Sequence, residues 1–201
     1  MPYFRYSSAE AGYLAARDPL LGAAINRIGH IDRAVFPDLF ESVINAIAGQ
    51  QISSKALYTV WKRLCDTVGA ITPANLRAAG EERLRACGLS GRKAGYILSA
   101  AQAAADGTID FAHLADMDDE AVIDALTVLP GVGRWTAEMM LIFSLERPDV
   151  LPYDDLGIRK GLCRLYGLDS LTKEQFAVYR ARYAPHATIA ALYLWEIAAG
   201  K

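Results

Sequence analysis

Leu129-Pro130-Gly131-Val132-Gly133 separates two stretches with helical periodicity, which we place at residues 118–129 and 134–144. Glycine adopts positive φ without steric cost and lets another backbone approach closely, so this pattern is typical of a tight hairpin. The second helix begins directly after it, and its free N–H groups and positive dipole end then offer a site for one phosphate. The same turn can also join two packed helices without any further role.

Helical periodicity covers most of the chain outside the hairpin. Apolar residues recur at three- and four-residue steps over 39–48 and again over 56–64, which is the stripe of an amphipathic helix. Thr72-Pro73 starts another helix with proline at its first position, and the alanine-rich residues 100–105 also favour helix. Strand signals are weak, because no alternating β-branched run persists for six residues. The sequence therefore predicts a compact all-α protein of one domain or two small lobes.

The composition is that of a soluble globular protein. Of the 201 residues, 53% are hydrophobic and 22% are charged. No apolar run reaches the roughly 20 residues that span a bilayer, and Met1 to Arg5 lack the layout of a signal peptide. We therefore expect no membrane partner and a cytoplasmic protein, nucleoid-associated if bacterial. The net charge of −2 is unfavourable for a nucleic-acid partner, so DNA binding would require a local basic face.

Cysteine and histidine form no metal or disulfide pattern. The three cysteines, Cys65, Cys87 and Cys163, are scattered and odd in number, which argues against a disulfide framework and a metal knuckle. The three histidines are widely spaced and form no His-Glu-x-x-His motif. We therefore expect no catalytic metal and no cofactor.

Besides the hairpin, Asp155 is the second feature of the sequence that indicates a function. It lies 24 residues beyond Gly131 (155 − 131), at the start of the next helical stretch. Aspartate is a favoured helix N-cap, so Asp155 could have a purely structural role. Capping and catalysis are compatible, however, because a carboxylate at a helix start is oriented and kept ionised. Both roles remain open on the residues alone.

The hairpin and the following aspartate together resemble the signature of the helix–hairpin–helix (HhH-GPD) DNA glycosylase superfamily. Four segments are similar, in the right order, to its 3-methyladenine DNA glycosylase II (AlkA-like) branch: residues 40–53, 88–94, 129–137 and 192–195. The resemblance implies an all-α helix–hairpin–helix glycosylase fold, with two helical lobes flanking an active-site cleft. Within this single domain one lobe would span about 36–145, and the other would combine 1–35 with 146–201. The N-terminal β-containing domain of longer relatives is expected to be missing.

The implied activity is that of a monofunctional DNA glycosylase, which excises alkylated purines of the 3-methyladenine and 7-methylguanine type in base excision repair. Such an enzyme flips the nucleotide out of the duplex and hydrolyses the N-glycosidic bond. By resemblance Asp155 is the catalytic carboxylate, which stabilises positive charge on the sugar and orients or deprotonates water. Asp154 is its local rival, but the match through Leu156-Gly157-Ile158 favours Asp155. Relatives that also cut the strand carry a lysine at the position of Trp135, so no AP-lyase activity is expected.

The resemblance also implies a base pocket formed by Trp135, Trp195 and Met139, because a cationic base favours an aromatic wall. Either tryptophan could instead be a core residue, and Met139 replaces an aromatic residue of the resembled enzyme. Gln51 occupies the position of the residue that fills the gap left by the flipped nucleotide. Its relatives carry a bulkier apolar side chain there, so Gln51 either hydrogen-bonds the opposite base or is a solvated loop residue.

Damaged double-stranded DNA is thus the expected partner, bound by a monomer. The residues expected to contact it share a place in the hairpin or in a nearby turn: Gln51, Pro130, Gly131, Val132, Gly133, Arg134, Lys55 and Lys93. Each basic residue could also be merely solvated. The resemblance further implies a monovalent cation held by main-chain oxygens around Leu129 and Val132.

Three other functions stay open. A glycosylase for another damaged base, oxidised or deaminated, would fit the unusual pocket residue Met139. A non-catalytic DNA-binding module could use the hairpin as a phosphate clamp, but it would have no reason to place a carboxylate at position 155 beside a repelling phosphodiester. An all-α protein–protein scaffold would leave the hairpin glycines and Trp135 unexplained.

Overall fold

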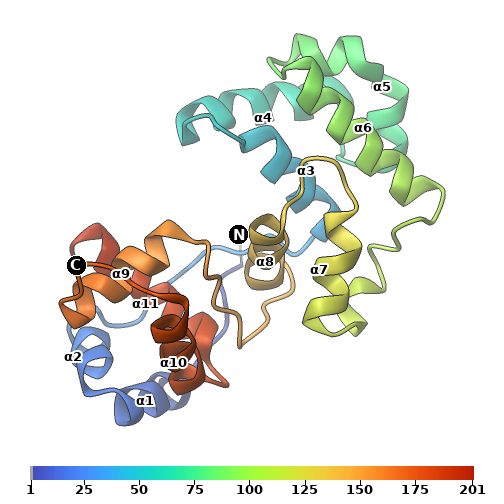
Figure 1. The fold of residues 1–201 in the computed structure, drawn as a ribbon. Coiled ribbons are helices and arrows are strands. Elements are labelled where there is room, and N and C mark those ends of the chain that lie inside the picture. The colour runs from blue at the N-terminus through green and yellow to red at the C-terminus, as the bar shows by residue number, and fades with distance from the viewer. Residues whose placement is uncertain (1) are drawn as a thin grey trace. The chain divides into compact units, whose positions relative to one another are not determined.

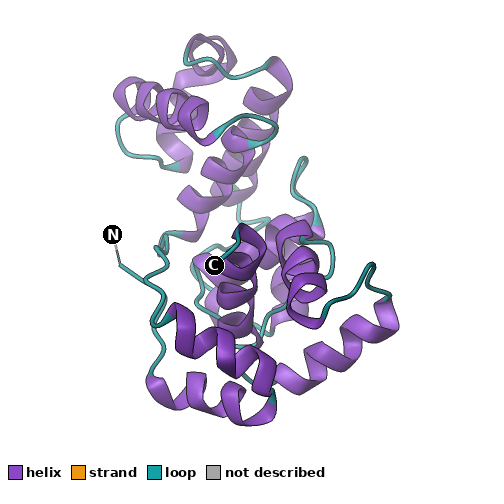
Figure 2. Cartoon of the chain, turned by 90° about the vertical axis from the view of Figure 1, so that its left-hand side faces the viewer, coloured by secondary structure: helices purple, strands orange, loops and turns teal. Residues whose placement is uncertain are grey.

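The computed structural model describes residues 2–201, and these form α-helices joined by loops, without a sheet (Figures 1 and 2). The only strand-like pairing among them is an isolated bridge between Tyr3 and Ala34. The elements are α1 (Ser8–Arg17), α2 (Pro19–Ile28), α3 (Leu39–Gly49), α4 (Ser54–Val68), α5 (Pro73–Ala86), α6 (Gly91–Ala105), the 3₁₀ turn η1 (Leu114–Asp116), α7 (Asp119–Thr127), α8 (Arg134–Phe143), α9 (Leu156–Tyr166), α10 (Lys173–Tyr183) and α11 (Ala187–Ala199). The all-α prediction is confirmed.

The contacts divide the chain into two compact units. The first combines the N-terminal segment up to Val35 with the C-terminal segment from Leu141, and the second runs from Phe36 to Met140. The sequence places the later boundary after residue 145, whereas the contacts place it after Met140, within α8. Within residues 2–201, no helix is both long enough and apolar enough to cross a bilayer.

The unit of residues 36–140 is built from capped helices around an aliphatic core. The N-cap side chains of α3, α4, α6 and α7 each accept a backbone N–H of the first turn, which satisfies one of the donors that a helix start leaves free. The predicted stripe of α3 is buried throughout. In α4 only Leu64 of the predicted stripe is buried, while Leu57 and Val60 are partly exposed. An amphipathic pattern alone does not reveal how much of its apolar face a neighbour will cover.

The other unit packs α1, α2, α9 and α10 around α11. Helix α11 is apolar on all sides, and every residue from Ala187 to Leu194 is buried, as expected for a helix surrounded by others. Helices α1 and α2 are not among the predicted helices. Both carry start signals nonetheless: Ser7 and Glu10 form a capping box for α1, and Asp18 caps α2 directly before Pro19.

Candidate functional site

The predicted hairpin joins α7 to α8. Its turn closes through the Val132 N–H, which donates to the Leu129 carbonyl at 3.0 Å. The Gly133 carbonyl accepts the Ala137 N–H at 3.0 Å, so α8 starts directly at the end of the hairpin. Pro130, Gly131 and Gly133 are exposed, while the Val132 side chain is buried. The hairpin therefore presents backbone to its surroundings, as a phosphate clamp requires.

The two glycines of the hairpin differ in what they require. Gly131 has φ +85°, and a Cβ atom there would overlap the ring of Tyr96 on α6. Gly133 has no such restriction, because a Cβ there would meet nothing within 4 Å and its φ lies outside the left-handed range. Of these two positions, only 131 requires glycine, because of its positive φ and the nearby Tyr96 ring.

The turn after α3 carries the predicted gap-filling residue. Gln51 is exposed and has φ +57°, which is uncommon for a residue other than glycine. The preceding Gln50 donates its side-chain amide to the Gly131 carbonyl at 2.6 Å. Lys93 of α6 donates its ammonium to the carbonyls of Ala48 at 2.8 Å and Gln50 at 2.6 Å. This turn and the hairpin are therefore connected within one unit.

The basic residues expected to contact DNA lie in different environments. Lys55 is exposed in the first turn of α4. Arg134, the first residue of α8, is ion-paired with Glu120 in two hydrogen bonds of 2.9 and 2.5 Å and also approaches Glu138. Its guanidinium holds the pKa of Glu120 below the usual range. Arg134 would therefore have to exchange carboxylate partners for phosphate on binding DNA.

Asp155 is the N-cap of α9 and is buried, with 7% of its surface exposed. Its Oδ1 accepts the Ile158 N–H at 2.8 Å and the indole N–H of Trp195 at 2.9 Å. A Cβ at Gly157 would lie 2.7 Å from the Trp195 ring and 3.1 Å from Oδ1, so glycine makes room for this pair. Asp154, the local rival, is exposed. The structure thus places at position 155 an oriented carboxylate with little access to bulk water.

The three residues expected to form the base pocket fall in both units. Trp195 belongs to the same unit as Asp155, where it stacks on Phe143 with ring centroids 5.6 Å apart. The Arg33 guanidinium lies over its ring, 5.5 Å from the centroid. Trp135 and Met139 lie one turn apart on α8; Trp135 is 45% exposed and Met139 is buried. Their role as base-pocket residues stays a prediction.

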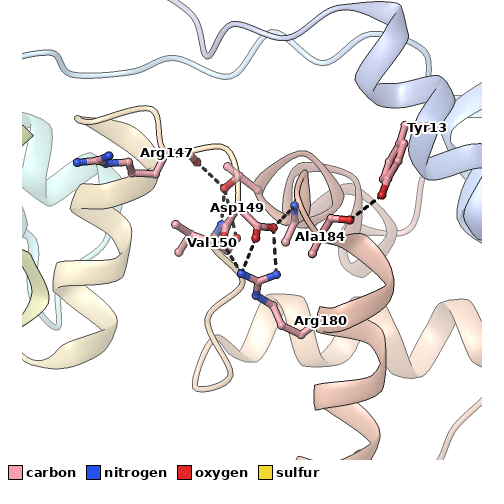
Figure 3. A network of polar contacts seen from close by, with 8 residues as sticks. Tyr13, Arg147, Asp149, Val150, Arg180 and Ala184 are labelled. Carbon is pink, nitrogen blue, oxygen red and sulfur yellow. Dashed lines mark hydrogen bonds and ion pairs between the residues drawn. The ribbon is translucent and has the colours of Figure 1, made fainter. Parts of the chain in front are cut away.

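The loop that leads to Asp155 is fixed to α10 and α11 (Figure 3). Arg180 of α10 forms a bidentate ion pair with Asp149, at 3.0 and 2.9 Å, and also donates to the Asp149 carbonyl at 2.6 Å. The Asp149 carboxylate accepts the Ala187 N–H at 3.1 Å. One side chain of the loop therefore connects to two helices.

Thr188 of α11 fixes the same loop from inside the core. Its hydroxyl donates to the Arg147 carbonyl at 2.6 Å and accepts the Val150 N–H at 2.9 Å. Thr188 is fully buried, so no water replaces these bonds if the hydroxyl is lost. Asp149, Arg180 and Thr188 are not predictable from the sequence, because long-range contacts between side chains and backbone leave no periodic signal.

Thr188→Val is therefore expected to lower the free energy of unfolding by about 2–4 kcal/mol, since at nearly constant side-chain volume it leaves the buried Val150 N–H and the half-buried Arg147 carbonyl without their partner. Chemical denaturation measures the change. The matched control is Thr59→Val on the exposed face of α4, where the hydroxyl bonds only the Lys55 carbonyl of its own helix. Its effect should stay within about 0.5 kcal/mol. Equal effects of the two substitutions would contradict this role of Thr188.

No group of three or more metal-ligating side chains occurs among residues 2–201. For the monovalent cation implied by the resemblance, the Leu129 carbonyl already accepts the Val132 N–H, and each carbonyl oxygen has two lone pairs. The cation site at Leu129 and Val132 stays a prediction.

Comparison with known proteins places this arrangement in context. The family model described as HhH-GPD superfamily base excision DNA repair protein matches residues 44–185. DNA-3-methyladenine glycosylase 1 of Schizosaccharomyces pombe is 39% identical over 78% of this chain and 71% of its own length. The crystal structure of a DNA-3-methyladenine glycosidase from Bacillus halodurans superposes with a TM-score of 0.88 at 35% identity, covering 100% of this chain and 94% of the other. A 3-methyladenine DNA glycosylase of the fission yeast, solved in complex with abasic DNA, gives a TM-score of 0.81 at 34% identity, with 94% and 95% covered.

Proposed function

Because this chain belongs to the HhH-GPD superfamily of base excision DNA repair proteins, we propose that it is a monofunctional DNA glycosylase that excises alkylated purines from damaged double-stranded DNA. The observation that carries the proposal is the buried carboxylate of Asp155, held by the Ile158 N–H and the Trp195 indole. Cleavage of an N-glycosidic bond develops positive charge on the sugar, and a fixed anion in a site with little water stabilises that charge strongly.

An alkylated purine such as 3-methyladenine carries a positive charge and departs readily as a neutral base. The reaction then needs an anion and a positioned water, and it needs no dedicated general acid. Asp155 supplies the anion and can orient or deprotonate the water. The two donors on Oδ1 keep the carboxylate in one orientation, so little reorganisation accompanies the reaction.

The hairpin supplies the DNA contact in this proposal. Its exposed backbone and the start of α8 bind a phosphate, and such a contact positions the protein without reading sequence. Trp135 is the second residue of the same helix and has no amine that could form a Schiff base with the sugar. The products are therefore a free base and an intact strand with an abasic site.

A panel of lesion duplexes tests the proposal. The protein is incubated with DNA containing 3-methyladenine, 7-methylguanine, 8-oxoguanine or uracil, and both the free base and the strand length are followed. The expected result is release of the methylated purines, with strand breaks appearing only after alkali. Release of 8-oxoguanine or uracil alone would replace this function with repair of another lesion. Binding of every duplex without release of any base would instead indicate a binding module.

A further inference from the structure

Lys93 binds backbone carbonyls of its own chain, unlike an exposed lysine that is available to bind phosphate. Its ammonium donates to the carbonyl of Ala48, in the last turn of α3, at 2.8 Å and to that of Gln50, the C-cap of the helix, at 2.6 Å. The carbonyls at the end of a helix lack intrahelical partners and carry the negative end of the dipole, so an ammonium is well placed there. Burial, and after it the neighbouring Arg92, lowers the pKa of Lys93, in keeping with an ammonium withdrawn from water. Two of its three donors are thus already engaged.

The same helix also supports the hairpin. Tyr96 lies three residues after Lys93, on the same side of α6, and its ring fills the space where any side chain at position 131 would lie. Gln50 completes the connection, because its backbone carbonyl accepts from Lys93 while its side chain donates to the Gly131 carbonyl at 2.6 Å. Both the turn that carries Gln51 and the hairpin therefore contact the same face of α6.

We propose that Lys93 is a positioning residue, which together with Gln50 and Tyr96 joins the turn bearing Gln51 to the phosphate-binding hairpin as one rigid element. The hairpin fixes the protein on the DNA backbone, and the link then sets the place at which Gln51 enters the duplex. Lys93 acts through this geometry and makes no phosphate contact of its own. The assignment rests on the proposed function, since it names how that activity displaces a nucleotide.

Lys93→Met tests the assignment, because methionine matches the aliphatic part of the lysine side chain and removes the ammonium. A lysine that binds phosphate contributes about 1 to the slope of log affinity against log salt concentration. Affinity is measured over a range of salt concentrations on a duplex that contains a tetrahydrofuran abasic-site analogue. We expect Lys93→Met to leave the slope unchanged, and Lys55→Met, which removes an exposed lysine of the same unit, to lower it by about 1.

Base release provides the second readout. A misplaced insertion turn should lower the single-turnover rate by a factor on the order of 10 to 100. Gln51→Ala should also lower this rate, and the double variant should be no slower than the slower single variant, because both changes remove the same action. A slope that falls by about 1 in Lys93→Met would overturn the assignment. Additive losses with Gln51→Ala, or a release rate equal to wild type, would do so as well.

Two further outcomes are covered: a Lys93→Met variant that does not fold, and a wild type that releases no base. If Lys93→Met does not fold, Gln50→Met breaks the bond to Gly131 without touching the ammonium, and it must show the same non-additive loss with Gln51→Ala. If the wild type releases no base from any duplex, the proposed function fails. The salt slope of Lys93→Met then still decides whether Lys93 contacts phosphate.

Discussion

Asp155→Asn is expected to lower the single-turnover rate of base release by a factor on the order of 10² to 10³, with little change in affinity for DNA. Asparagine is as good an N-cap as aspartate, and its amide oxygen can still accept the Ile158 N–H and the Trp195 indole. The substitution therefore removes the negative charge while leaving α9 and its cap in place. A rate measured at saturating protein isolates the chemical step from binding.

Asp154→Asn is the matched control for this prediction. It removes the same charge one residue earlier, from a side chain that is exposed and takes no part in capping α9. Its rate should stay within about threefold of the wild type, because an exposed charge is screened by water and salt. A severe loss of rate in Asp154→Asn together with a mild loss in Asp155→Asn would contradict this prediction and assign the catalytic role to Asp154.

Gly131→Ala is expected to lower the free energy of unfolding by about 2–4 kcal/mol and to weaken binding to duplex DNA by about tenfold. The new Cβ must accept a positive φ and would also overlap the Tyr96 ring. The hairpin can relieve this overlap only by moving its backbone, and that movement displaces the N–H groups that bind phosphate. Denaturation and a DNA-binding titration measure the two effects.

Gly133→Ala separates this effect from a general need for glycine in the hairpin. A Cβ at position 133 would meet nothing within 4 Å, and its φ lies outside the left-handed range. We therefore expect a change in stability within about 0.5 kcal/mol and DNA affinity close to wild type. If both alanine variants lost binding equally, the contrast between the two glycines would be wrong.

Local signals made part of this fold predictable from the sequence. The stripe over residues 39–48, the proline that starts α5 and the hairpin at 129–133 each depend on neighbours within one or two helical turns. The same local logic also places Asp155 at a helix start. The capping box of Ser7 and Glu10 before α1 is an equally local signal, which also predicts a helix start.

Contacts between distant residues were not predictable. The pairing of Lys93 with carbonyls more than 40 residues away, and of Gln50 with Gly131, depends on how α3, α6 and the hairpin pack. Sequence alone indicates a solvent-exposed lysine equally well. The partial exposure of the α4 stripe has the same origin, since a hydrophobic pattern shows which face is apolar and says nothing of what covers it.

The most direct test of the central claim is the identity of what the protein releases from methylated duplex DNA. Wild type and Asp155→Asn are compared at equal occupancy of the DNA, with free bases separated by chromatography and strand integrity followed in parallel. We expect the wild type to release 3-methyladenine while the strands stay intact, and Asp155→Asn to release almost none. Release by Asp155→Asn at the wild-type rate, or strand cleavage that accompanies release, would contradict a monofunctional glycosylase that acts through Asp155.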